Sequence, residues 1–150
     1  MKFMKKIVPE SKGLPVYQFD KNFFTGPSNL EVVKILSERG VSTIFSVLPK
    51  TTGFAFKLNE YAKKYGIKVV YFNHSAYRSP DFSLLVAKQA FKLSRTKKVA
   101  VCCIDGNFST HVVGSDFLKL KRSESELKRK KLKVPQIKNK CMGIVRRRIK

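Results

Sequence analysis

The chain has 150 residues, 43% of them hydrophobic, and carries 32 lysines and arginines against 10 acidic residues, a formal net charge of +22. This size and composition predict one globular domain with a single core, and no apolar run is long enough to span a membrane. Because solubility needs only a few net charges, the excess predicts a polyanionic partner, foremost nucleic acid, otherwise a phosphorylated or acidic protein.

The cysteines and histidines exclude several classes of site. Three cysteines, two of them adjacent, do not form a disulfide framework, and the first residues lack a signal-peptide core. We therefore expect an intracellular reducing compartment, cytoplasm or nucleus, or the inside of a viral particle. The two histidines and scattered acids lack metal-ligand spacing, and no glycine-rich nucleotide fingerprint is present, so neither a metal nor a cofactor is expected.

The first third of the chain predicts a basic arm, a strand and a helix. Residues 1–13 are basic and are expected to be irregular, 14–19 form a strand and 20–27 a turn. Ser28 and Glu31 form a capping box that begins a helix, and Gly40 ends it.

Strands and helices then alternate. The apolar patterns predict strand, helix, strand, helix and strand over residues 41–48, 54–65, 67–72, 80–93 and 99–103, and a further helix from about 107 to 120. This α/β order predicts a mostly parallel central sheet flanked by helices, over residues 14–120. Sites in such sheets lie at the carboxyl ends of the strands, so the loops after residues 48, 72 and 103 are expected to converge.

The last of these strands leads into a candidate reactive loop. It ends in Cys102 and Cys103, Gly106 follows three residues later, and a helical apolar pattern begins at Phe108. Backbone N–H groups in such a loop, together with the helix N-terminus, attract negative charge. A thiolate there is a nucleophile, which makes Cys103 the candidate. The alternative is that both cysteines are core residues at a strand end.

The loop resembles the signature loop of the cysteine-dependent protein tyrosine and dual-specificity phosphatases. Their pattern is His-Cys, five residues with glycine third, then Arg-Ser/Thr; it aligns Cys103 with the nucleophile, Gly106 with the glycine and Thr110 with the hydroxyl. The order of elements over residues 14–120 is similar too, most of all to the small dual-specificity group, which includes RNA 5′-phosphatases. The resemblance implies a phosphatase-like fold.

Three features depart from the pattern. Cys102 replaces the histidine, Ser109 replaces the arginine, and Asp105 adds a carboxylate inside the loop. The family arginine holds the phosphate by two charged hydrogen bonds, and loss of such a donor commonly costs roughly 3–4 kcal/mol of transition-state stabilisation. A carboxylate also repels a phosphate dianion. The departures predict a loop of phosphatase origin that is catalytically inactive.

The general acid is displaced as well. The resemblance expects an aspartate in the loop after residues 67–72, where this chain has Asn73 and His74, and the nearest carboxylate is Asp81. His74 and Asp81 are therefore the candidates to protonate a leaving group. Each also has a simpler interpretation, as an exposed loop histidine and as an acid at a helix start.

The chain ends in a basic extension, residues 121–150. Residues 119–150 hold 14 lysines and arginines against two acidic residues, and a short helix is expected from about Ser123 to Leu132. The candidate polyanion-binding residues are Lys128, Arg129, Lys130, Lys131, Arg146, Arg147 and Arg148. Alternatively, the extension is a disordered tail or a localisation signal.

Three functions stay open at this point. The favoured one is an inactive phosphatase-like protein that binds a phosphorylated partner or nucleic acid, or assembles with it, rather than an enzyme. The second is an active phosphatase for protein or RNA 5′-phosphate, in which another cation, such as Arg78, replaces the missing arginine. The third is a structural protein of a nucleoprotein particle, such as a virion or a ribosome-like assembly.

Overall fold

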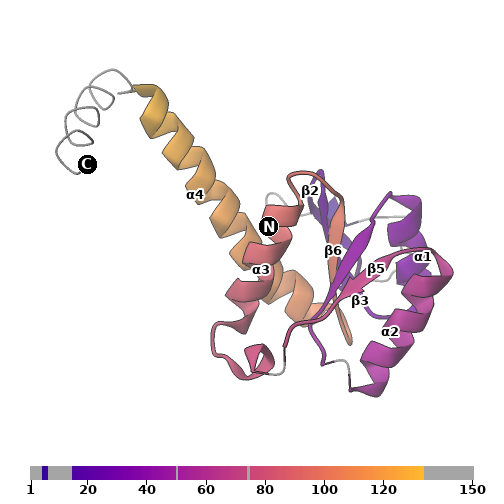
Figure 1. Ribbon diagram of the computed structural model, residues 1–150. Helices are drawn as coiled ribbons and strands as arrows, with labels where there is room; N and C mark the ends of the chain where they lie inside the picture. Colours follow the sequence, from indigo (N-terminus) through magenta and orange to yellow (C-terminus); the bar gives the residue numbers. More distant parts are fainter. Residues whose placement is uncertain (1–4, 7–14, 50, 74, 134–150) are drawn as a thin grey trace, which may run out of the picture. The chain divides into compact units, whose positions relative to one another are not determined.

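A mixed sheet of six strands, in the order β1-β2-β3-β6-β4-β5, forms the centre of the fold (Figure 1). The computed structural model describes residues 5–6, 15–49, 51–73 and 75–133. The strands are β1 (Lys5–Lys6), β2 (Tyr17–Asp20), β3 (Phe23–Pro27), β4 (Thr43–Ser46), β5 (Lys68–Val70) and β6 (Val99–Cys103). β1, β2 and β3 pair antiparallel, whereas β3, β6, β4 and β5 run parallel. The predicted α/β fold with a mostly parallel sheet is confirmed.

Helices cover both faces of this sheet (Figure 1). The helices are α1 (Leu30–Glu38), α2 (Gly53–Lys64), the short 3-10 helix η1 (Ala76–Arg78), α3 (Phe82–Leu93), the π-helix η2 (Phe108–Val113) and α4 (Gly114–Lys133). α1 and α2 pack on one face, in a core cluster that includes Leu36, Leu58 and Ile44. α3 and the first turn of α4 lie on the other face, where Phe117 contacts Phe91 and Phe23.

The pleat of the strands assigns each residue to a face, because successive side chains point in opposite directions. In β6, Ala100 and Cys102 belong to the core cluster under α1 and α2. Cys103 therefore faces the side of α3 and η2. Thr25 of β3 faces that side too, since its hydroxyl contacts Thr110 of η2.

β3 corrects the predicted turn over residues 20–27. Its five residues are all buried, and they pair along the whole of β6. Gly26 and Pro27 are typical turn residues, but here each suits a strand. A Cβ at Gly26 would lie 3.0 Å from Val32, so the missing side chain admits α1, and Pro27 ends the strand, where a missing donor is tolerated.

Three helix boundaries also differ from the prediction. The N-cap of α1 is Asn29, whose Oδ1 accepts from the N–H of Val32 (2.9 Å), rather than Ser28. α3 begins at Phe82 rather than at residue 80, and in the turn before it Ser79 Oγ accepts from the N–H of Asp81 (3.2 Å). α4 runs without a break to Lys133 and does not stop near 120, because residues 119–133 contain no glycine or proline.

The chain divides into two compact units, residues 1–118 and 119–150. Within the predicted irregular arm, Lys5 and Lys6 form a strand with β2; the arm's other residues up to 13, and the end of the basic extension from 134, lie outside the described residues. Among the described helices none is long and apolar enough to cross a membrane.

Phe23→Ala is expected to lower the free energy of unfolding by roughly 3–5 kcal/mol. The Phe23 ring is fully buried and stacks on Phe117 with 3.9 Å between centroids, so its removal leaves a cavity between the sheet and α4. Urea denaturation measures the change. The control is Phe56→Ala, at a side chain that is 63% exposed, and it should shift stability by no more than about 0.5 kcal/mol. Equal effects of the two changes would contradict the assignment of β3 to the core.

Candidate functional site

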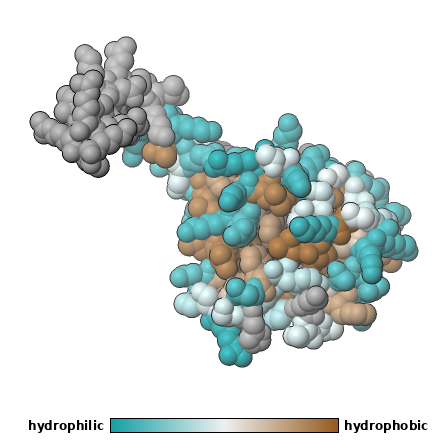
Figure 2. Space-filling model, viewed as in Figure 1, coloured by the Kyte–Doolittle hydropathy of each residue, from teal (hydrophilic) through white to brown (hydrophobic). Residues whose placement is uncertain are grey.

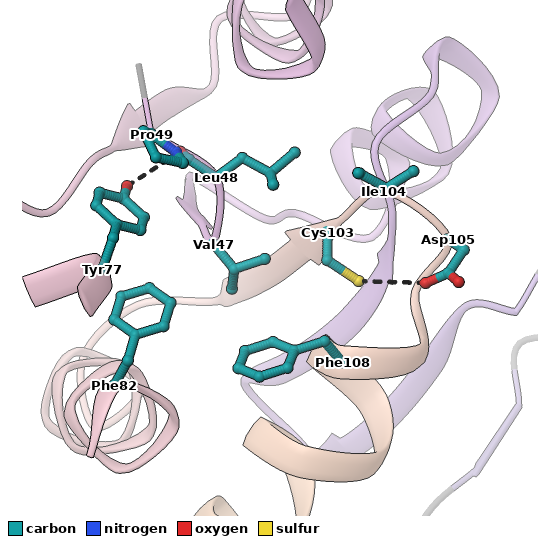
Figure 3. Close-up of a pocket in the computed structure, with 9 residues that line it drawn as sticks. All are labelled: Val47, Leu48, Pro49, Tyr77, Phe82, Cys103, Ile104, Asp105 and Phe108. Carbon is teal, nitrogen blue, oxygen red and sulfur yellow. Dashed lines mark hydrogen bonds between the residues drawn. The ribbon is translucent and has the colours of Figure 1, made fainter. Parts of the chain in front are cut away.

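A pocket of about 510 Å³ opens where the loops after β4, β5 and β6 meet (Figure 3). The β4 loop contributes Val47, Leu48 and Pro49, the segment after β5 contributes Tyr77 and Phe82, and the loop after β6 contributes Cys103, Ile104, Asp105 and Phe108. The predicted convergence of these three loops is confirmed. It follows from the parallel arrangement of β4, β5 and β6, whose carboxyl ends share one edge.

Cys103 lies at the base of this pocket and is wrapped by the loop that follows it. Its Sγ accepts hydrogen bonds from the backbone N–H of Gly106 (3.1 Å) and of Ser109 (3.5 Å). The side chain is 4% exposed, and that exposure opens into the pocket. Converging N–H dipoles of this kind stabilise negative charge at one point, so the loop has the geometry expected around a nucleophilic sulfur.

Gly106 makes the tight turn of the loop possible. Its φ of +86° lies in the left-handed region that glycine tolerates best. A Cβ there would also lie 3.2 Å from the backbone nitrogen of Pro27 at the end of β3. The glycine of the sequence pattern is therefore required both by backbone conformation and by close packing.

Ser109, at the position of the family arginine, is directed into the loop. The residue is fully buried. Its Oγ lies 3.4 Å from Cys103 Sγ, 3.1 Å from the carbonyl oxygen of Gly106 and 3.3 Å from that of Gly26. The hydroxyl is thus engaged with the loop's own atoms, and Ser109 is not among the residues that line the pocket.

Asp105 places a carboxylate beside the sulfur. Its Oδ1 lies 3.8 Å from Cys103 Sγ, which donates to it, as the dashed line in Figure 3 marks. The two carboxylate oxygens also accept from the backbone N–H of Asn107 (3.0 Å) and from its side-chain amide (3.1 Å). These bonds fix an exposed negative group on the wall of the pocket.

Aromatic rings form much of the remaining wall. The ring centroids of Phe82 and Phe108 lie 6.3 Å apart, with the ring planes 18° from parallel (Figure 3). The ring centroids of Tyr77 and Phe82 lie 4.9 Å apart. The sequence pattern does not assign these rings to the site, because Phe82 and Phe108 fit the apolar faces of predicted helices. The one indication in the sequence is that Phe82 and Phe108 each follow shortly after a loop at the carboxyl end of a predicted strand.

The hydroxyl of Tyr77 is used for structure rather than exposed to a ligand. It accepts from the N–H of Phe72 (3.2 Å) and lies within donating distance of the carbonyl oxygens of Ser46 (3.2 Å) and Leu48 (3.0 Å). Burial raises the pKa of Tyr77 above its usual value. The side chain therefore ties the β4 loop to the segment after β5.

The other candidates lie apart from the pocket or outside the description. Asp81 and Arg78 are exposed and do not line the pocket, and His74 lies outside the described residues. Cys102 is fully buried on the opposite face, where burial raises the pKa of its thiol. Thr110 is buried and its hydroxyl lies 2.7 Å from that of Thr25.

The polyanion candidates fall on α4 and beyond it. Lys128, Arg129 and Lys130 are exposed on this helix, and Lys128 pairs with Glu124 at 3.6 Å. The side chain of Lys131 and the residues Arg146, Arg147 and Arg148 lie outside the described part. In the described ranges, no group of three histidine, cysteine or acidic residues could hold a metal ion.

Comparison with known proteins supports the resemblance at the level of fold. No family model matches the chain, and no curated protein matches its sequence. Two solved structures are similar in fold: TpbA of P. aeruginosa, a tyrosine phosphatase, and its cysteine-to-serine variant in complex with phosphotyrosine. Each is 20% identical, with a TM-score of 0.51 over 70% of this chain. This chain has the phosphatase-like fold. It spans about 60% of the length of the TpbA structures.

Thr110→Val is expected to lower the free energy of unfolding by about 1–3 kcal/mol, because it leaves the buried Thr25 hydroxyl without its partner. The double variant Thr25→Val/Thr110→Val removes both hydroxyls and should be less destabilised than the two single changes added together. Urea denaturation of all four proteins gives this coupling energy. Strictly additive effects would show that the contact between β3 and the phosphatase-like loop contributes nothing.

Proposed function

We propose that this protein is a phosphatase-fold protein without phosphate-ester hydrolase activity, which acts as a basic binding or assembly protein for nucleic acid or a phosphorylated partner. The proposal joins two parts of the chain. The phosphatase-like loop has lost the chemistry of phosphate transfer, and the exposed basic residues of α4 provide the contact with a polyanion.

The observation that carries the first part is the lining of the pocket above Cys103. Among the described residues that line it, none is a lysine or arginine, and the single charged group is the carboxylate of Asp105. Phosphate binding and its transition state need charged donors aimed at the oxygens. The Ser109 hydroxyl cannot supply them, because it is buried among loop carbonyls.

The natural protein is expected to show no hydrolysis of an aryl phosphate above a Cys103→Ser blank. The variant Ser109→Arg/Asp105→Ala restores a guanidinium and removes the carboxylate, and it should gain measurable turnover. One such donor group is commonly worth roughly 3–4 kcal/mol of barrier, which is about a few hundred-fold in rate. Release of phosphate from p-nitrophenyl phosphate and from an RNA 5′-triphosphate gives the measurement.

The same assay decides against the proposal if the natural protein turns over either substrate in a Cys103-dependent manner. One observation favours that second candidate, an active phosphatase: the N–H groups of Gly106 and Ser109 already point at the sulfur. In that case Arg78→Ala would next test whether a different cation has replaced the arginine.

The second part of the proposal depends on charge. Residues 119–150 alone hold 14 of the 32 lysines and arginines, and in Figure 2 the part of α4 that is in view carries mainly hydrophilic residues beside one hydrophobic patch. Cationic side chains that neutralise phosphates release counterions, so the resulting binding is strong, independent of sequence and sensitive to salt. A binding protein that lacks turnover would use this surface rather than the pocket for its polyanion.

The triple change of Lys128, Arg129 and Lys130 to alanine is expected to weaken binding to nucleic acid and to reduce the slope of log K against log salt by about 2–3. Fluorescence anisotropy with a labelled duplex and a labelled single strand measures both quantities.

A matched control removes the same charge from the other unit. Lys57, Lys63 and Lys64 are exposed on α2, and their triple change to alanine should alter the slope less. Equal slopes for the two triple variants would show that binding follows net charge alone, without a contribution specific to α4.

A further inference from the structure

The pocket above Cys103, which lacks cationic groups for phosphate, is lined mainly by apolar and aromatic side chains. Six of its lining side chains are apolar: Val47, Leu48, Pro49, Phe82, Ile104 and Phe108. Together with the ring of Tyr77 they form walls that suit a flat, uncharged group, because aromatic rings pack well in offset or edge-to-face contact. A volume of about 510 Å³ has room for a six-membered ring.

The carboxylate of Asp105 is a hydrogen-bond acceptor on the wall of the pocket. An ionised carboxylate has about four lone-pair sites. The oxygens of Asp105 receive hydrogens from the two nitrogens of Asn107 and from the Cys103 thiol, which leaves capacity for one more donor. The Tyr77 hydroxyl, by contrast, is already engaged with the backbone. A ligand with one donor, and no negative charge, therefore complements the pocket.

Apolar surface continues beyond the mouth of the pocket. Ile104 is 49% exposed, Phe108 36%, and Val112, one turn further along η2, 40%. A small free molecule seated on the pocket would leave Val112 uncovered. A polypeptide segment would cover this rim with its neighbouring residues while one side chain enters the pocket.

We infer that the pocket above Cys103 binds the uncharged side chain of a tyrosine in a partner polypeptide, with the phenol hydroxyl donating to Asp105 and the ring packed against Phe82 and Phe108. This inference rests on the proposed function, because a loop that held phosphate would bind the phosphorylated side chain instead. Phosphorylation of the partner tyrosine would then release it, since a phosphate dianion would meet the Asp105 carboxylate.

Three amino-acid amides that differ only at the para position of the ring test the inference on the unsubstituted protein: N-acetyltyrosinamide, N-acetylphenylalaninamide and N-acetyl-O-phosphotyrosinamide. Methyl NMR titration follows Val47, Leu48 and Ile104 at the pocket, with Ile44 and Leu58 in the opposite core as references. We expect the tyrosine amide to bind about tenfold or more tightly than the phenylalanine amide, which lacks the donor to a charged acceptor. The phosphotyrosine amide should bind more weakly than the tyrosine amide by a similar factor, measured at high salt to screen the net charge.

Two variants assign the preference to one residue. Asp105→Asn should bring the tyrosine and phenylalanine amides close to equal affinity. It should also reduce the ratio of the affinity for the tyrosine amide to that for the phosphotyrosine amide. Asp81→Asn removes the same charge from an exposed residue that does not line the pocket, and it should leave the order unchanged. A hexapeptide with a central tyrosine and apolar neighbours should shift the Val112 methyls as well, which the single amides should not.

Phosphotyrosine that binds as tightly as tyrosine, or a tyrosine amide that shifts no pocket methyl, would overturn the inference. Both readouts use the natural protein, so they do not depend on the folding of a variant. Neither result bears on the proposed loss of hydrolase activity, which fails on Cys103-dependent release of phosphate. That release is visible in the same samples with the phosphotyrosine amide.

Discussion

The closure of the loop around one sulfur atom organises the site. Two backbone N–H groups, from Gly106 and Ser109, converge on Cys103 Sγ, and they can do so because Gly106 adopts a left-handed conformation against Pro27. The hydrogen bond between Thr25 and Thr110 joins the far end of the loop to β3. The backbone of the loop therefore directs its donors at the sulfur, while several of its side chains differ from the phosphatase pattern.

The departures from the phosphatase pattern all affect one property, the affinity of the pocket for a phosphate group. A serine takes the position of the arginine and folds inward, a carboxylate stands on the pocket wall, and the lining is otherwise apolar or aromatic. Each change alone would weaken phosphate binding, and together they describe a different kind of pocket. The exposed residues Lys128, Arg129 and Lys130 lie on α4, whereas the described residues that line the pocket include no lysine or arginine.

The sequence was informative where local pattern and tertiary structure agree. The sequence predicts the strand at residues 99–103 with the bounds that β6 has, because five apolar residues are bounded by lysines and by the glycine loop. The local pattern does not predict β3, because Gly26 and Pro27 are typical turn residues and pairing with β6 overrides that preference. Motif spacing located Cys103, Gly106 and Ser109, but it gave no means to separate the pocket rings of Phe82 and Phe108 from core residues, since both follow the period of a helix. The inward direction of Ser109 depends in part on the carbonyl group of Gly26 in β3, more than eighty residues away in the chain.

The pleat of β6 places two adjacent cysteines in different environments on opposite faces of the sheet. Cys102 points into the apolar core under α1 and α2, where burial raises the pKa of its thiol, whereas the sulfur of Cys103 borders the pocket. A thiol reagent that enters the pocket meets one of the two sulfurs and not its neighbour. A probe attached at Cys103 would therefore report occupancy of the pocket directly. Cys102 would stay unlabelled for as long as the sheet stays folded.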